Sequence, residues 1–263
     1  MIINLHDISS AKIYSRIVSL VPSQTELLYD LGLEDEVVGI TKFCIHPTDW
    51  YRNKPRIGGT KNIKIPAIQD LKPDLIIANK EENVKEQVGE LARDHDVFVT
   101  DVNNLSDATS MIKDLGLLVG KTKEALQISN KIEDAFKKLK DVTSIKRKIK
   151  AAYLIWKDPF MAAGGHTFIN DILQYCNLEN IFSSKERYPE ITLEQLRNNC
   201  ELILMSSEPY PFREKHLKEM ELQIPGVKII LADGEMFSWY GSRLLKAVDY
   251  FKVLQLQIVL CRE

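Results

Sequence analysis

Hydrophobic positions in the first half of the chain group into short apolar runs, separated by segments with helical spacing. The apolar runs predict strands at Arg16–Val21, 37–40, Asp74–Ala78 and 97–102. The segment 23–33, SQTELLYDLGL, predicts the first helix, with Ser23 as its N-cap and Glu26 completing a capping box. Strands that alternate with helices in this way are typical of a parallel sheet with helices on both faces.

The second half repeats this order of elements. A strand at Ala151–Trp156 is followed by a helix over 167–178 and a short apolar run, ENIF. The stretch TLEQLRNNCELILMSS then matches IPAIQDLKPDLIIANK of the first half element for element. A helix near Arg213–Leu222 and a strand at Val227–Asp233 complete the set. The pattern therefore predicts a duplicated architecture.

The segment between the halves, Lys121–Val142, contains no glycine or proline and keeps its apolar residues at helical spacing. At 1.5 Å per residue, a helix of this length would be a rod of about 33 Å. We therefore predict an α/β protein of two lobes, each a mostly parallel sheet flanked by helices, joined by one long rigid helix. The predicted division is an N-terminal lobe over 1–120, a backbone helix over 121–145 and a C-terminal lobe over 146–263.

Composition narrows the class of protein. The net charge of −2 gives no electrostatic reason to expect nucleic acid as a partner. No apolar stretch approaches the roughly 18–20 residues that span a bilayer, and the first residues lack the features of a signal peptide. The protein would be periplasmic if a leader was removed and cytoplasmic if Met1 is the native start, and we expect a monomer. The four cysteines are Cys44, Cys176, Cys200 and Cys261. They are scattered along the chain and indicate neither a disulfide framework nor a structural zinc site.

Aromatic residues are concentrated in the loops that follow the predicted strands. Since ligands of open parallel sheets bind outside the carboxyl ends of the strands, these loops would line a cleft between the lobes. The stretch Asp233–Ala247 is one of these loops, and its aromatic residues Phe237, Trp239 and Tyr240 span too few positions to share one face. We expect Trp239 and Tyr240 to contact a ligand, with Phe237 as a further candidate, although aromatics near a helix start also serve as core.

Charged residues in these loops have two open interpretations. Arg243 would meet a ligand carboxylate or form a salt bridge to Glu235 or Asp233. Glu81, Glu82 and Glu208 would line the cleft or face solvent. The segment GGHTF (164–168) is best interpreted as a turn with Thr167 as N-cap, the alternative being a helix start whose N–H groups receive an anionic ligand group. In the first lobe, we interpret residues 102–112, VNNLSDATSMI, as the loop that corresponds to Asp233–Ala247 of the second lobe.

Cys44 and His46 in KFCIHP are the weak candidates for metal binding. Alternate residues of an extended loop point the same way, and a thiolate with an imidazole suits zinc, copper or iron. A full site needs three or four ligands, and no second cluster is visible in the sequence. We therefore predict no metal site and no intrinsic cofactor, and we keep His46 as a candidate ligand contact.

Several motifs, taken together and in order, indicate a known family. They are RIVSLVPSQTELLYDLG, VVGITKFCIHP, LKPDLIIANKEEN and FMAAGGHTFINDILQYCNLENIF with RYPEITLEQL. Over about residues 12–259 the chain resembles the class III, helical-backbone substrate-binding proteins of ABC importers, and is most similar to the vitamin B12 (cobalamin)-binding and ferric-siderophore- or haem-binding types.

The resemblance implies roles for particular residues. Phe43 and His46 match the family's first aromatic loop, Tyr188 matches a tryptophan that faces the ligand, and Glu235 and Trp239 match the last ligand-facing loop. Thr60 and Asn79 replace two further family aromatics.

The resemblance also implies a docking partner. Glu194 matches one of the two glutamates that dock the family on a permease, and the other falls at or next to Pro66.

The function expected from the resemblance is binding without catalysis. The protein would hold a cobalamin-, haem- or siderophore-like metal chelate in the cleft between the lobes and deliver it to an ABC-type permease. One alternative is a cytoplasmic paralogue that binds or senses such a ligand without a permease. A less favoured one is an enzyme acting on a tetrapyrrole or metal chelate, with His46 and Glu235 as acid–base candidates.

Overall fold

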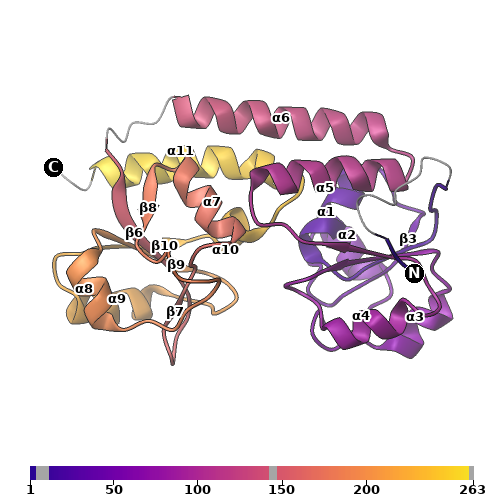
Figure 1. Ribbon diagram of the computed structural model, residues 1–263, viewed down its shortest axis with the longest axis horizontal. Helices are drawn as coiled ribbons and strands as arrows, with labels where there is room; N and C mark the ends of the chain where they lie inside the picture. Colours follow the sequence, from indigo (N-terminus) through magenta and orange to yellow (C-terminus); the bar gives the residue numbers. More distant parts are fainter. Residues whose placement is uncertain (4–11, 142–146, 261–263) are drawn as a thin grey trace. The chain divides into compact units, whose positions relative to one another are not determined.

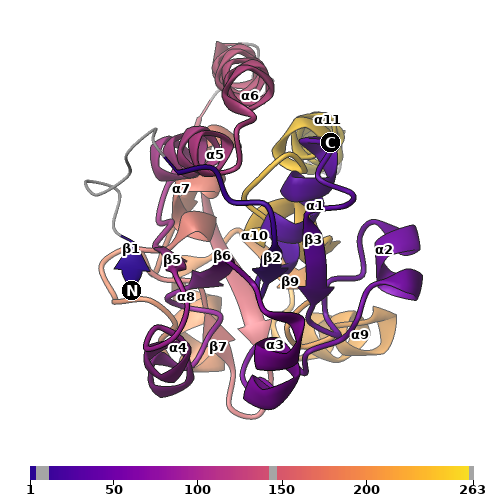
Figure 2. The ribbon, with the colours of Figure 1, turned by 90° about the vertical axis from the view of Figure 1, so that its right-hand side faces the viewer.

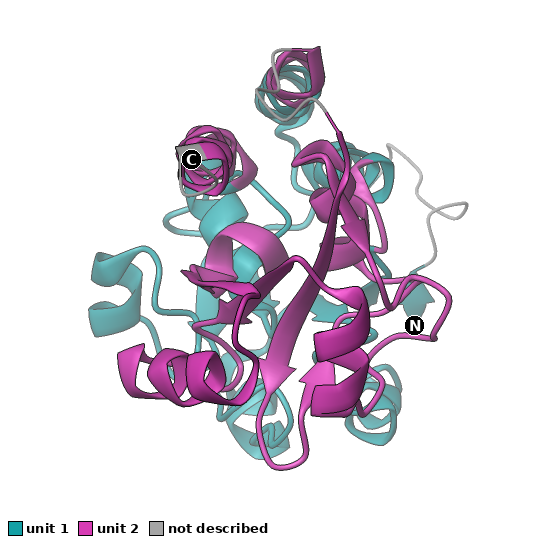
Figure 3. Ribbon diagram, turned by 90° about the vertical axis from the view of Figure 1, so that its left-hand side faces the viewer, with its two compact units in different colours: residues 1–102, 106–133, 240–243 teal, residues 103–105, 134–239, 244–263 magenta. Residues whose placement is uncertain are grey.

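The chain forms two compact units, which are coloured separately in Figure 3. The computed structural model describes residues 1–3, 12–141 and 147–260. Residues 142–146 at the end of the predicted backbone helix, and Cys261, lie outside the described residues. Unit 1 comprises residues 1–102, 106–133 and 240–243, and unit 2 comprises 103–105, 134–239 and 244–263. Within the described parts of the chain, no helix is both long and apolar enough to cross a bilayer.

Unit 1 is built on a parallel sheet in the order β1-β5-β4-β2-β3. Figure 2 shows α3 and α4 on one face of this sheet and α1 and α5 on the other. The strands are β1 (Ile2–Ile3), β2 (Ile17–Ser19), β3 (Val37–Ile40), β4 (Leu75–Asn79) and β5 (Val97–Thr100). The helices are α1 (Pro22–Asp30), α2 (Thr48–Asn53), α3 (Ile65–Leu71), α4 (Lys85–Leu91) and α5 (Leu105–Leu118).

Side chains along β2 and β4 of unit 1 point alternately to the two faces of the sheet and are buried on both. Val18 and Ile76 pack with Ile68 of α3 and Leu91 of α4 in one buried cluster. Successive strand side chains point to opposite faces, so the neighbouring residues, such as Ile77, are fully buried on the other face. Continuous apolar strands of this kind are expected for a parallel sheet covered on both sides.

Unit 2 is built on a sheet in the order β10-β9-β6-β7, with β8 also paired to β6. In Figure 1, α8 and α9 lie on one face of this sheet and α7 and α11 on the other. The strands are β6 (Ile149–Trp156), β7 (Met161–Ala162), β8 (Leu178–Asn180), β9 (Leu202–Ser206) and β10 (Lys228–Ala232). The helices are α7 (Phe168–Tyr175), α8 (Leu193–Asn199), α9 (Glu214–Gln223), α10 (Gly234–Ser238) and α11 (Leu244–Leu260).

The two sheets share one topology. The parallel order β5-β4-β2-β3 of unit 1 is repeated as β10-β9-β6-β8 in unit 2. The additions are β1, which is parallel to β5, and β7, which is antiparallel to β6. The predicted α/β class, with two parallel sheets flanked by helices, is confirmed.

The long helix predicted over 121–142 forms as α6 (Thr122–Asp141). Its residues 122–133 belong to unit 1 and 134–141 to unit 2. The division of the chain at residues 120 and 145 stays a prediction.

The start of α1 differs from the prediction. Ser23 is not the N-cap, because the helix already begins at Pro22, with Val21 as a cap residue that offers no side-chain bond. Proline suits the first helical position, since its fixed φ is helical and its missing N–H would have no partner there. The capping box of Ser23 and Glu26 is therefore wrong, and the Glu26 carboxylate pairs with Arg243, as described below.

Two further helices were not expected. Residues 102–112, interpreted as a loop, contain the beginning of α5, and the loop after β3 contains α2. The cap of α7 is as expected, since the Thr167 hydroxyl accepts a hydrogen bond from the backbone N–H of Asn170 at 3.2 Å.

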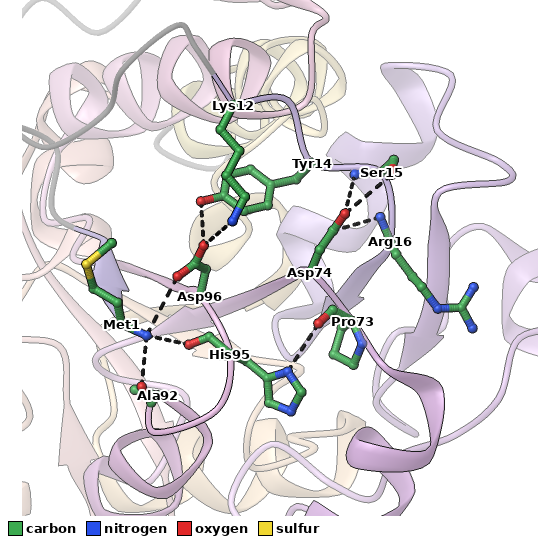
Figure 4. A network of polar contacts seen from close by, with 10 residues as sticks. All are labelled: Met1, Lys12, Tyr14, Ser15, Arg16, Pro73, Asp74, Ala92, His95 and Asp96. Carbon is green, nitrogen blue, oxygen red and sulfur yellow. Dashed lines mark hydrogen bonds and ion pairs between the residues drawn. The ribbon is translucent and has the colours of Figure 1, made fainter.

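A polar network ties the first residues of the chain to the sheet of unit 1 (Figure 4). The Asp96 carboxylate lies 2.5 Å from Lys12 Nζ and accepts a hydrogen bond from the Tyr14 hydroxyl at 2.9 Å. Burial acts to raise the pKa of Asp96, but these two bonds together with the positive charges of Lys12 and the N-terminus lower the pKa. Nearby, Asp74 accepts backbone N–H bonds from Ser15 and Arg16, at 3.0 and 2.8 Å.

Candidate ligand-binding residues

Phe43 is the exposed aromatic residue of unit 1 at the carboxyl end of β3. Half of its side chain is accessible, at 50% exposure. Lys42 Nζ lies 5.0 Å from the ring centroid, within the range of a cation–π interaction. Gly59 makes room for both, because a Cβ there would lie 3.2 Å from Phe43 Cε2 and 3.3 Å from Lys42 Cε. Phe43 is thus an open aromatic surface with a lysine beside it.

Cys44 and His46 of the same loop have different environments. His46 is half-buried, whereas Cys44 is fully buried. The Cys44 Sγ lies 3.1 Å from the hydroxyls of both Thr25 and Thr41. Burial raises the pKa of the Cys44 thiol to about 11, so it stays protonated near neutral pH and is a poor metal ligand. The described residues contain no group of three or more histidine, cysteine or acidic side chains placed to hold a metal ion.

Asn79, at one of the positions where the family has an aromatic residue, has a structural role instead. The side-chain oxygen of buried Asn79 accepts backbone N–H bonds from Glu81 and Glu82 at 2.8 and 3.1 Å. The Asn79 N–H donates to the Asn83 side-chain oxygen at 2.8 Å, and the Asn83 amide nitrogen donates to the Thr60 carbonyl at 3.0 Å. Asn79 in the turn after β4 and Thr60, the two positions matched to family aromatics, are therefore linked through Asn83.

In unit 2, Trp239 is held by a carboxylate at the carboxyl end of β9. The indole Nε1–H donates to Glu208 Oε1 at 2.9 Å, and the Ser238 hydroxyl donates to the same oxygen at 2.8 Å. Trp239 is 7% exposed and ends the short helix α10, which Asp233 caps by accepting from the Glu235 N–H at 3.1 Å.

The neighbours of Trp239 differ in accessibility. Glu235 is half-buried and Tyr240 is buried. Phe237 has no exposed surface and packs against Tyr153 and Phe251, with ring centroids 4.8 and 4.9 Å away. Phe237 is thus a core residue of unit 2 in this structure, and a ligand contact by Phe237 stays a prediction.

Tyr188 is half-buried and lies in a loop that is held by the glycines of GGHTF. The Gly164 N–H donates to the Arg187 carbonyl at 2.6 Å, and the Gly165 N–H donates to the Lys185 carbonyl at 2.7 Å. A Cβ on Gly165 would lie only 2.2 Å from the Ser183 carbonyl oxygen. These N–H groups therefore support the loop that carries Tyr188, which the sequence pattern did not reveal.

Arg243 forms a buried ion pair within unit 1. Its Nε and Nη2 lie 2.7 and 3.1 Å from the two carboxylate oxygens of Glu26, in a bidentate arrangement. The sequence suggested a ligand carboxylate, Glu235 or Asp233 as the partner. Glu26 was missed because it is 217 residues away along the chain. Both partners belong to unit 1, which includes residues 240–243.

The two positions matched to permease docking lie on equivalent helices. Glu194 is exposed in the first turn of α8, whose N-terminus is fixed by a capping box of Thr192 and Gln195. Pro66 is in the first turn of α3 and lines an open, mostly apolar hollow together with Glu90 of α4. An acidic side chain therefore lines the same hollow as Pro66.

Comparisons with known proteins identify the family. Residues 17–224 match the family model described as periplasmic binding protein. The chain is 22% identical over 214 residues to the vitamin B12-binding protein of Vibrio campbellii, covering 81% of this chain and 78% of that protein.

Solved structures show the same fold. The periplasmic vitamin B12-binding protein of Vibrio cholerae is 21% identical with a TM-score of 0.76, covering 93% of this chain and 97% of that one. A periplasmic haem-binding protein of Pseudomonas aeruginosa is 18% identical with a TM-score of 0.79, covering 92% of each chain. These relatives are named as binding proteins, and the resemblance inferred from the sequence motifs is confirmed. The chain belongs to the periplasmic binding protein family.

Proposed function

We propose that this protein binds a cobalamin-, haem- or siderophore-like metal chelate and delivers it to an ABC-type permease. The observation that carries the proposal is the family match over residues 17–224, together with relatives named for vitamin B12 and haem. We further infer that it binds its ligand without catalysing a reaction.

Aromatic side chains at the carboxyl ends of the strands support a flat ligand. Unit 1 presents the half-exposed ring of Phe43, and unit 2 carries Trp239 and the half-buried Tyr188 in its loops. Rings of this kind stack on planar ligands and contribute a large apolar area at a low cost in side-chain entropy. His46 and Glu235, which are half-buried, would fix the orientation of the ligand through polar contacts. That the ligand lies between the lobes stays a prediction.

The three chelate classes can be separated by titration. Purified protein would be titrated with cyanocobalamin, hemin and a ferric siderophore, with absorbance and heat as readouts. We expect saturable binding of one class with a Kd of about 1 μM or tighter, which corresponds to ~8 kcal/mol of binding free energy. Failure of all three to bind would contradict the proposal.

Single substitutions locate the site in that titration. Trp239→Ala and Tyr188→Ala should weaken binding, each by about tenfold or more, because buried aromatic anchors dominate binding energy. The matched control is Tyr29→Ala, an exposed aromatic in the last turn of α1 that has its own ring contact with Trp50. Equal affinity in all three variants would place the site elsewhere.

Delivery to a permease is tested separately through Glu194. In cells that express the chain with its transporter, Glu194→Ala should reduce ligand uptake while the affinity for ligand in solution stays unchanged. Glu90→Ala tests whether the acidic residue beside Pro66 contributes from unit 1. Unchanged uptake in both variants would favour the second candidate, a binding or sensing protein that acts without a permease, which Pro66 already favours.

The alternative that the protein is an enzyme can be tested by following the bound ligand over time. If His46 and Glu235 served as an acid–base pair, a bound chelate would change with time. We expect mass spectrometry to recover the ligand unchanged after hours of incubation with the protein, and a modified ligand would support the enzyme alternative.

A further inference from the structure

The environment of Glu208 in unit 2 is unusual for a charged side chain. It follows β9, it is mostly removed from solvent, and one carboxylate oxygen accepts both of its described side-chain hydrogen bonds. Among the described residues, no lysine or arginine forms an ion pair with it. Its donors are instead two neutral groups, the Ser238 hydroxyl and the Trp239 indole N–H.

The backbone of Glu208 is fixed by its surroundings. The Ser206 hydroxyl donates to the Glu208 carbonyl at 2.6 Å and accepts from the Tyr153 hydroxyl at 3.0 Å. Gly234 closes the other side, since a Cβ there would lie 2.4 Å from Glu208 Cγ and 2.6 Å from Ser206 Oγ. The end of β9 and the beginning of α10 therefore restrict where the Glu208 side chain can lie.

The surroundings of Glu208 and its two hydrogen bonds have opposite effects on its pKa. Burial raises the pKa of Glu208, as do the nearby charges of Glu235 and Asp233, while the bonds from Ser238 and Trp239 lower it. Because no lysine or arginine among the described residues pairs with it, the carboxyl group relies on these two neutral donors. The indole is consequently held by a directional bond to an oxygen whose position is fixed by the backbone.

The hydrogen bond to Glu208 contributes to the orientation of the Trp239 ring, which is 7% exposed. Trp239 is the C-cap residue of α10, with extended backbone angles. An indole that is fixed before binding loses less side-chain entropy when a ligand stacks on it. We propose that Glu208 is a positioning residue, which orients the Trp239 indole for ligand stacking through the Oε1···H–Nε1 bond. This inference rests on the proposed function for its consequence on affinity.

Hydrogen exchange of the indole N–H tests the positioning without any ligand. The chain has three tryptophans, whose indole N–H signals are resolved by NMR and assigned by Trp239→Phe. In Glu208→Ala the Trp239 indole N–H should exchange about tenfold faster or more, because a bond to a charged acceptor is lost. Glu208→Gln, which keeps an acceptor oxygen, should restore most of the protection.

The other two tryptophans serve as internal references. The Trp50 indole donates to Glu34 in unit 1, at 2.5 Å, so its exchange should not change in Glu208→Ala. Trp156 is exposed and gives the rate of an accessible side chain. Ser238→Ala is the matched control, since it removes the second donor and leaves the carboxylate–indole bond in place. Equal Trp239 exchange in the wild type and Glu208→Ala would overturn the proposal.

A double-mutant cycle tests the consequence for binding. With cyanocobalamin and hemin as probes, Glu208→Ala should weaken the binding of the probe that binds by about tenfold in the wild-type background. In the Trp239→Phe background the same substitution should change affinity by less than about twofold, because the indole through which it acts is gone. A tenfold loss in both backgrounds would mean that Glu208 contacts the ligand itself, and would contradict a positioning role.

The two proposals fail in different ways. If neither probe binds the wild-type protein, the proposed function falls, while the exchange experiment still decides the Glu208–Trp239 link. If a probe binds and both Trp239→Phe and Glu208→Ala leave affinity unchanged, the inference about Glu208 falls and the proposed function stands.

Discussion

Glu26 of unit 1 is buried and Glu208 of unit 2 is half-buried, and the two side chains are stabilised in opposite ways. In unit 1, Glu26 of α1 forms a bidentate ion pair with Arg243, at 2.7 and 3.1 Å. In unit 2, the side-chain donors to Glu208 among the described residues are a hydroxyl and an indole N–H, at 2.8 and 2.9 Å. The first arrangement neutralises the charge, and the second leaves it in place and uses it to hold an aromatic ring.

The aromatic residues follow the same contrast. Phe43 of unit 1 is half-exposed and rests on Gly59 with Lys42 beside it, without a hydrogen bond to fix its ring. Trp239 of unit 2 has a polar atom in its ring and is anchored through it. Loops after two sheets of the same strand order therefore hold their aromatic residues differently. Phe43 is exposed and has no polar anchor, whereas Trp239 is mostly buried and is anchored by a hydrogen bond.

Removing the cation of the unit 1 pair should have the largest effect on stability. Arg243→Met removes the cation paired with the buried Glu26 carboxylate, which costs about 3–5 kcal/mol of the free energy of unfolding. Urea denaturation of the variant measures this loss. The double variant with Glu26→Leu should recover most of it, since both charges are then absent; a double variant as unstable as the single one would contradict the assignment.

Two glycines that support the aromatic residues should differ in their tolerance of a methyl group. At Gly234 a Cβ would meet Glu208 Cγ at 2.4 Å and Ser206 Oγ at 2.6 Å, so Gly234→Ala should lower the free energy of unfolding by about 1–3 kcal/mol. At Gly59 the contacts are 3.2 Å or more, to the ends of the Phe43 and Lys42 side chains, which can move.

Gly59→Ala is therefore the matched control and should cost less than about 0.5 kcal/mol. Thermal unfolding of the two variants measures the difference. Equal costs would mean that the unit 2 site is as adaptable as the unit 1 loop.

The smallest effect is expected in the pH dependence of stability. Because the pKa of Glu208 is raised by burial, the folded chain binds this proton more tightly than the unfolded chain does. Its contribution to stability is present below the unfolded value of about 4.5 and is lost as the pH rises through the folded value.

Glu208→Gln removes this contribution. The stability of the variant relative to the wild type should therefore increase from pH 4 to pH 7, as measured by chemical denaturation at each pH. A relative stability that falls over this range would show that the carboxylate is favoured over the neutral acid.

The periodicity of the sequence was sufficient for the sheets and for most helices, because buried parallel strands appear as continuous apolar runs. The periodicity was insufficient where one residue could take part in either of two local structures. Ser23 and Glu26 have the spacing of a capping box, but Pro22 takes the first helical position and Glu26 pairs with Arg243. Contacts between residues far apart in the sequence leave no periodic signal. Trp239 and Glu208 are 31 positions apart, and Arg243 and Glu26 are 217 positions apart.

The central claim is that this chain carries a metal chelate, and the most direct test is the ligand that the protein retains when it is purified from its native host. Absorbance and native mass spectra should reveal one corrin, haem or ferric chelate per chain, and the ligand should be lost from Trp239→Ala. A protein that carries none of these and binds none in the titration would contradict the account.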